Sequence, residues 1–199
     1  MLKRWLRFAA LSLSIALASS LLAAHDLPMN TVMNAFVKIE PHQAHLVVRV
    51  PLDLLRGVPF PMKGSQYDLA ASGPATQQAV QALADGLVML ENGVRLVPSN
   101  SSGRLSLPSD RSFENYDSAL ALMARPPDLT MGIAYGLGSF DAHFIYPISS
   151  PKSVFKIQTL VAADLKEHVK LTVRYLPIGE KSRAMMITGA SRHSMSLVR

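Results

Sequence analysis

The 199-residue chain contains no cysteine, no internal repeat and no long apolar run beyond residue 24. Without cysteine no disulfide scaffold can form, so a hydrophobic core must stabilise the fold alone. After residue 24, charges or prolines interrupt every apolar run, and none approaches the roughly 20 residues of a membrane-spanning helix. With 49% hydrophobic residues, the composition is that of one globular domain and excludes a disordered chain.

Motifs that would identify a chemical reaction are also missing. No serine lies in a Gly-x-Ser-x-Gly motif, and Gly136-Leu137-Gly138-Ser139 lacks the third glycine and the Lys-Ser/Thr pair of a phosphate-binding loop. Basic residues are dispersed, whereas a nucleic-acid-binding surface gathers them on one side with aromatic residues. The sequence therefore favours neither an enzyme nor a nucleic-acid-binding protein.

The first 24 residues have the charge order of a secretory signal peptide. Three basic residues stand between positions 3 and 7, and the uncharged segment from Phe8 to Leu22 follows. We expect cleavage after Ala24, with a competing site after Ser20, because the alternative of an uncleaved anchor needs a longer apolar run. The protein would be exported to the periplasm or to the outer face of the cytoplasmic membrane. Its mature part would carry 17 basic against 14 acidic groups, a net charge of +3.

Alternating apolar and polar residues predict β-strands with one buried face. The clearest segment spans 168–175, and two more, 33–39 and 46–50, flank the turn Pro41-His42-Gln43 as a hairpin. A second hairpin is predicted at Asn92-Gly93, since these residues tolerate the positive φ angles of a type I′ turn. The residues expected in the core are Val37, Ile39, Val48, Val50, Val169, Leu171 and Val173.

Two helices are expected between the strands. The first, 74–85, begins with a proline and is followed by Gly86, and its Ala-rich and Gln-rich body predicts a surface helix. The second, 113–124, has apolar residues at helical spacing and ends before Arg125-Pro126-Pro127. Residues available to cap its start are Ser109, Asp110 and Ser112.

Eight or nine short strands with few helices predict a mainly β fold. The expected architecture is an antiparallel β-sandwich of immunoglobulin-like type with one or two short helical insertions. The expected organisation is a signal peptide at 1–24, the β-sandwich domain at 25–190, and a tail at 191–199 that could begin a linker to a membrane domain.

Five segments resemble the extracytoplasmic N-terminal region of the HupE/UreJ-like bacterial membrane proteins: Phe36-Val37-Lys38, Arg49-Val50-Pro51-Leu52, Leu107-Pro108-Ser109-Asp110-Arg111-Ser112-Phe113, Phe144-Ile145-Tyr146-Pro147-Ile148 and Tyr175-Leu176-Pro177-Ile178-Gly179. In that family this region precedes a multi-helix membrane domain, and the name-giving members are associated with nickel supply to hydrogenase and urease. The resemblance implies an envelope domain that belongs to, or serves, a membrane protein. It implies nothing about nickel permeation for these residues, because the sequence ends at Arg199 before any such helix.

Asp110 and Arg111 stand in the most distinctive of these segments. As a functional pair they could bind a ligand. As structural residues, Ser109 and Asp110 would cap the following helix through its free backbone N–H groups, and we favour this interpretation.

The candidate metal ligands are His25, His42 and His45. Cleavage after Ala24 would place the α-amino nitrogen of His25 beside its own imidazole, a chelate suited to copper(II) or nickel(II). A third ligand would be His42 or His45, if the first hairpin brings its turn back toward the terminus. Without such a role, the side chains of His45 and His168 are expected in solvent on polar strand faces, and the environment of His143 stays open.

Two functions are compatible with these features. The first is a noncatalytic periplasmic accessory or binding domain with a membrane protein or membrane domain as its partner. The alternative is a stand-alone periplasmic protein that binds copper or nickel through the mature N-terminal histidine.

Overall fold

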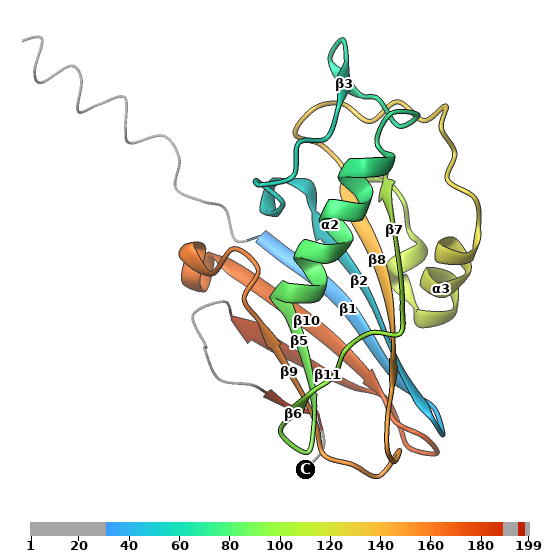
Figure 1. The fold of residues 1–199 in the computed structure, drawn as a ribbon, viewed down its shortest axis with the longest axis vertical. Coiled ribbons are helices and arrows are strands. Elements are labelled where there is room, and N and C mark those ends of the chain that lie inside the picture. The colour runs from blue at the N-terminus through green and yellow to red at the C-terminus, as the bar shows by residue number, and fades with distance from the viewer. Residues whose placement is uncertain (1–30, 189–194, 198–199) are drawn as a thin grey trace, which may run out of the picture.

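The computed structural model describes residues 31–188 and 195–197 (Figure 1). Its largest element is a six-stranded sheet in the spatial order β11-β10-β1-β2-β8-β7. In chain order these strands are β1 (Thr31–Ile39), β2 (Gln43–Pro51), β7 (Asn100–Ser106), β8 (Ser139–Pro147), β10 (Val169–Leu176) and β11 (Arg183–Thr188). Two smaller sheets accompany it.

The second sheet has four strands in the order β12-β9-β5-β6, and a two-stranded sheet joins β3 to β4. Their bounds are β5 (Leu87–Glu91), β6 (Val94–Arg95), β9 (Phe155–Thr159), β12 (Met195–Ser196), β3 (Met62–Lys63) and β4 (Gln66–Tyr67). The helices are α2 (Gly73–Gly86) and α3 (Tyr116–Ala124), with short 3-10 turns η2 (Leu52–Leu54), η3 (Ser112–Glu114) and η4 (Ala163–His168).

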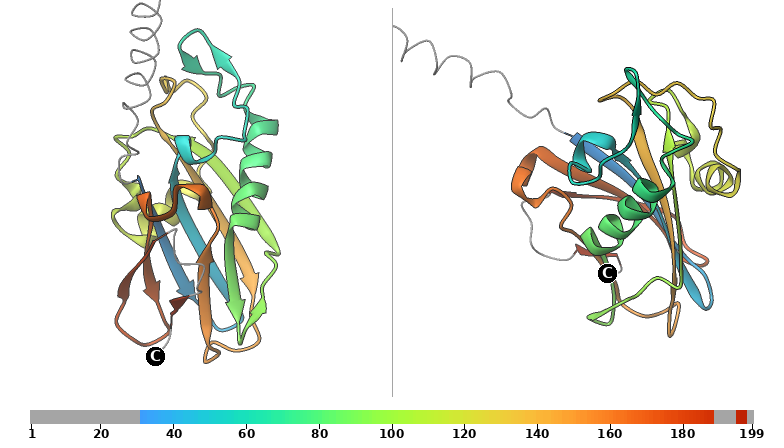
Figure 2. Two further views of the ribbon diagram at one scale, coloured as in Figure 1. Left: turned by 90° about the vertical axis from the view of Figure 1, so that its left-hand side faces the viewer. Right: turned by 45° about the horizontal axis from the view of Figure 1, so that its top comes forward.

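The main core lies between the six-stranded sheet on one side and the four-stranded sheet with α2 on the other. Leu46 and Val48 of β2 share this core with Ile157 of β9 and Leu83 of α2. The helix α3 covers the opposite face of the six-stranded sheet, so the two helices lie on different sides of it (Figure 2). The mainly β sandwich with helical insertions is therefore confirmed.

Period-two alternation identified the buried strand faces correctly. All seven residues expected in the core are fully buried. The first hairpin turns at His42 between β1 and β2. The second turns at Asn92 and Gly93, whose φ angles of 51° and 86° are both positive, as a type I′ turn requires.

The structure differs from the expected fold at two points. Strand β1 pairs in parallel with β10, in a register that runs from Thr31↔Val169 to Lys38↔Leu176. A parallel pair needs a long crossover connection, and the long chain between these two strands provides it. The second helix begins at Tyr116 and not at Phe113, since Asn115 is extended and its side chain accepts a hydrogen bond from the Ser118 N–H. Capping of this helix by Ser109, Asp110 or Ser112 is therefore wrong.

Candidate functional site

Polar side chains gather on the face of the six-stranded sheet that α3 partly covers, here called the outer face. On β2 this face carries His45, Val47 and Arg49, whereas the alternate residues enter the main core. The register of β2 with β8 places Asp141 opposite Arg49 and His143 opposite Val47. Two polar groups result, one around Arg49 and one around His45.

The first group, called the Arg49 cluster, consists of Arg49, Asp141, Asp110, Ser106 and Phe113. Asp141 is fully buried and accepts two hydrogen bonds from Arg49, at 2.7 Å from Nε to Oδ1 and 2.7 Å from Nη2 to Oδ2. The Ser106 hydroxyl donates a third at 2.6 Å. Arg49 also donates to the Oδ1 atom of Asp110 at 2.8 Å and to its carbonyl at 2.6 Å, and lies 4.4 Å from the centre of the Phe113 ring.

These contacts show what the distinctive Leu107–Phe113 segment does in the fold. It folds over Arg49, with Asp110 accepting from the guanidinium and from the Ser112 N–H at 2.9 Å. Burial raises the pKa of Asp110, but the hydrogen bonds from Arg49 and Ser112 lower it more, so its pKa lies below the ordinary value. The Asp110 carboxylate is thus held as an anion in a structural contact, whereas the Arg111 side chain pairs with Glu114 on the surface.

Two further arginines attach the α3 region to the outer face. Arg104 of β7 donates to the carbonyls of Leu122 and Arg125, both at 3.0 Å, at the C-terminal end of α3. Arg174 of β10 donates to the Glu114 carbonyl at 2.9 Å. Positive charge near the last carbonyls of a helix is favourable because these groups lack partners within the helix.

The second group is a pair of histidines with a nearby carboxylate. The Nδ1 atom of His45 lies 2.9 Å from the Nε2 atom of His143. The ring planes are 18° apart and their centres 5.1 Å apart. Stacked ring faces stay about 3.5 Å apart, so nitrogens this close show that the rings meet edge to edge through one N–H···N hydrogen bond.

Glu40 lies on the other side of His45. Its Oε2 atom is 3.4 Å from the Nε2 atom of His45, a nitrogen without a hydrogen-bond partner in the described part of the chain. The buried Tyr116 hydroxyl likewise has no hydrogen-bond partner among the described residues, and burial raises its pKa to about 12. Burial and the proximity of His45 lower the pKa of His143 to about 4.

The structure describes two of the three predicted metal ligands, His42 and His45. His25 lies outside the described residues, so the N-terminal chelate stays a prediction. His42 is exposed in the β1–β2 turn, whereas His45 is only 7% exposed, which makes the expectation of a solvated His45 wrong. Within residues 31–188 and 195–197, no three histidine or acidic side chains come together as a metal-binding group.

Sequence reasoning missed the partners that the structure assigns to His45 and Arg49. His143 and Asp141 follow each other at polar positions of β8, and their alternation with Phe140, Ala142 and Phe144 was the available signal. What the sequence could not supply is the β2–β8 register that pairs them. His168, expected at the start of a strand, instead ends η4.

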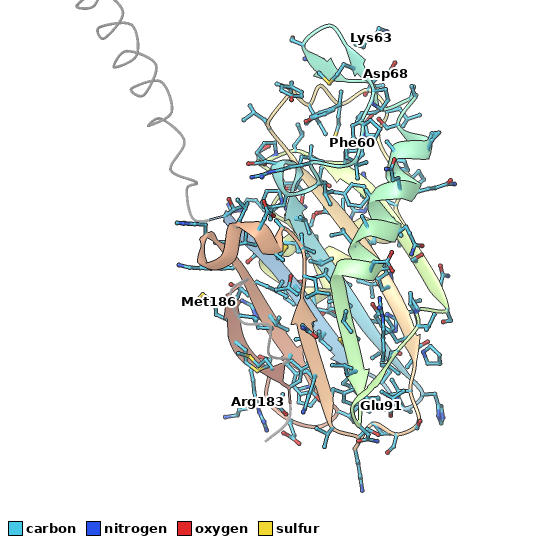
Figure 3. All side chains as sticks on the ribbon, turned by 60° about the vertical axis from the view of Figure 1, so that its left-hand side comes forward. Phe60, Lys63, Asp68, Glu91, Arg183 and Met186 are labelled. Carbon is cyan, nitrogen blue, oxygen red and sulfur yellow. The ribbon has the colours of Figure 1, made fainter. Side chains whose placement is uncertain are left out.

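Apolar side chains are exposed at one end of the molecule, here called the tip and made of residues 57–68 and 128–138. The tip includes the β3–β4 hairpin, and Phe60, Lys63 and Asp68 lie there, far from Glu91 and Arg183 (Figures 1 and 3). A groove of about 450 Å³ runs between η2 and the tip, lined by Leu52, Asp53, Leu55, Arg56, Val58, Pro59, Phe60, Tyr67, Tyr135 and Gly136. Exposed fractions reach 72% for Tyr135, 58% for Leu137 and 55% for Leu129.

Hydrogen bonds hold the two segments of the tip together. The Tyr67 N–H donates to the Ile133 carbonyl at 2.9 Å, and the Tyr135 N–H donates to the Ser65 carbonyl at 3.0 Å. A chain of aromatic contacts leads from the core to the surface, with ring centres 5.9 Å apart for Phe60 and Phe140, 6.1 Å for Phe60 and Tyr67, and 6.0 Å for Tyr67 and Tyr135. The exposed apolar side chains are therefore presented by braced loops.

Comparisons with known proteins assign the chain to no family. In the described parts of the chain, no helix combines the length and the apolar character needed to cross a bilayer. No protein-family model matches the sequence, and no curated protein matches it either.

Proposed function

We propose that the protein is an exported, noncatalytic binding or accessory domain of the cell envelope, related to the extracytoplasmic region of HupE/UreJ-like proteins. Its partner is a membrane protein, and the tip is the surface that contacts it. The observation that carries this proposal is the braced set of exposed apolar side chains at one end of the molecule. Exposed apolar patches on a folded domain mark interaction sites, and bracing reduces the ordering cost of binding.

The Arg49 cluster supports the family relationship. Three of the five segments that carry the resemblance meet in it, because Phe36 contacts Phe113 at 6.0 Å between ring centres and Arg49 binds Asp110. Two of these segments lie on the neighbouring strands β1 and β2, and the Leu107–Phe113 segment, which is distant in the sequence, folds back onto both. The cluster also supports a noncatalytic role, since its carboxylates are occupied by Arg49, Ser106 and Ser112.

Affinity purification from detergent-solubilised membranes of the native host tests this proposal. The wild-type domain should recover one polytopic membrane protein, and the tip variant Tyr135→Ser/Leu137→Ser should lose it. The matched control is Val94→Ser/Val97→Ser, which changes two residues of similar exposure, 69% and 73%, at and just after β6.

The control variant should retain the membrane protein at the wild-type level. Equal recovery by the tip variant would show that the tip is not the contact surface. Recovery of no membrane protein by any form would contradict the membrane partner itself.

A further inference from the structure

We propose that the protein forms a homodimer through strand β11, whose free edge pairs in antiparallel with β11 of a second copy about a two-fold axis at Met186. The pairing joins the two six-stranded sheets into one continuous sheet. This inference goes beyond the proposed function, because Met186 lies at the side of the molecule, away from Phe60 and Lys63 at the tip (Figure 3).

Strand β11 has a hydrogen-bonded neighbour on one side only. It pairs with β10 from Lys170↔Thr188 to Tyr175↔Arg183, and no other described strand pairs with it. The 3-10 turn η4 lies next to β11 without pairing with it. The backbone groups on the free side of β11 thus have no strand partner in the described part of the chain, and such a row is a template for another strand.

The composition of β11 lacks the features that usually protect a sheet edge. The strand has six residues, with no proline, lysine or acidic residue, and its one charge, Arg183, stands at its first position. The opposite edge strand, β7, differs, because it exposes Asn100, Ser101 and Ser102 and has both α2 and α3 packed against it. Of the two ends of the sheet, β11 is the one suited to a further strand.

The side chains of β11 alternate between the core and the outer face. Met185 and Ile187 pack in the main core. Ala184 and Met186 are exposed on the outer face, where Met186 reaches 57%. A strand that extends the sheet must match this alternation, with apolar residues on the core side.

A second copy of β11 meets this requirement. A two-fold axis perpendicular to the sheet keeps the two core faces on the same side, so residues that lie opposite each other must belong to the same face. With the axis at Met186, the positions opposite each other across the interface are Met186 and Met186, Met185 and Ile187, and Ala184 and Thr188. No like charges meet in these pairs, because Arg183 falls outside them.

The proposed interface is small. A stable complex buries roughly 800 Å² per partner, and one pair of six-residue strands provides less than this. The dimer should therefore be weak, and its population should depend on concentration in the micromolar range or above.

Sedimentation velocity over a series of concentrations tests the dimer, with protein from which the signal peptide has been removed. The wild type should shift from monomer to dimer as the concentration rises. Met186→Lys and Met186→Glu should each weaken association roughly tenfold, because each places two like charges opposite each other at the axis. An equimolar mixture of the two variants should associate again, because opposite charges then face each other.

Two controls show whether the effect belongs to β11. Val94→Lys adds the same charge to an exposed apolar residue of β6, the edge strand of the other sheet, and should associate like the wild type. The tip variant Tyr135→Ser/Leu137→Ser should also associate normally, which separates the dimer from the tip contact. A wild type that stays monomeric at every concentration would overturn the dimer. Folded Met186 variants that associate like the wild type, or a mixture that does not recover association, would overturn the pairing at Met186.

Disulfide cross-linking gives a second measurement, and it decides if a charged variant does not fold by circular dichroism. The chain has no cysteine, so Met186→Cys introduces one thiol per copy. Opposite residues of antiparallel strands have Cα atoms about 4.5–5.5 Å apart, a distance that a disulfide can span. Under mild oxidation Met186→Cys should form a covalent dimer, whereas Val94→Cys should stay monomeric. No cross-link in Met186→Cys, or equal cross-linking of the two variants, would contradict the proposed pairing.

Discussion

Arg49 and Asp141 form a charged pair beneath the Leu107–Phe113 segment. Because Asp141 is fully buried, removing its guanidinium partner leaves an unpaired charge inside the protein. Arg49→Met should lower the free energy of unfolding by about 3–5 kcal/mol. Urea denaturation followed by fluorescence measures the change.

The double variant Arg49→Met/Asp141→Leu is the control for this prediction. It removes both charges, so it should recover most of the lost stability, as apolar replacements of buried ion pairs often do. A double variant as unstable as Arg49→Met would show that packing, and not the unpaired charge, determines the loss.

The histidine pair predicts a specific pH dependence of stability. Burial lowers the pKa of His143 from 6.5 to about 4, so the unfolded chain binds a proton in this interval that the folded chain does not. The stability from His143 is complete above pH 6.5 and is lost as the pH falls toward 4; solvent screening of this partly exposed ring keeps the loss well below the roughly 3 kcal/mol that the full shift would give. His143→Gln should remove this loss in urea titrations between pH 7 and 4, whereas the exposed His42→Gln should keep it.

At the level of strands and helices, a substitution in β10 tests whether the predicted strand face is buried in the core. Leu171 is fully buried opposite Met33 of β1. Leu171→Ala should lower the free energy of unfolding by about 2–5 kcal/mol through lost apolar contact and a cavity. Leu160→Ala is the same chemical change at a residue that is 46% exposed, and it should alter stability by less than about 0.5 kcal/mol. Equal effects of the two substitutions in urea denaturation would contradict the burial assignment.

Strand faces were predictable because the side chains of a strand alternate between two sides, so that Val169 and Leu171 had to share one environment. Which strands pair with each other could not be predicted, because pairing depends on how distant parts of the chain come together in the fold. The parallel contact between β1 and β10 joins residues that are far apart in the sequence, such as Thr31 and Val169. The start of α3 was missed because several neighbouring residues can cap a helix, and only the extended backbone of Asn115 selects one.

At the scale of the whole molecule, the candidate sites depend on contacts between distant residues. His45 and His143 are 98 positions apart, and Arg49 and Asp141 are 92 apart. The sequence correctly placed His45 on the polar face of its strand. It could not show that α3 and the Leu107–Phe113 segment cover much of that face, which is why a residue expected in solvent is buried.

The 24 residues that begin the chain should direct export of the protein. A signal peptidase selects small residues before the cleavage site, so the mature protein should begin at His25 if Ala24 is used and at Leu21 if Ser20 is used. Mass spectrometry of the protein from the cell envelope distinguishes these termini. Ala24→Tyr should block cleavage at the first site, and Ser20→Tyr, the matched control, should leave the His25 terminus unchanged. A full-length product in the cytoplasm would contradict export, and a terminus at Leu21 in the wild type would remove the α-amino nitrogen from the proposed His25 chelate.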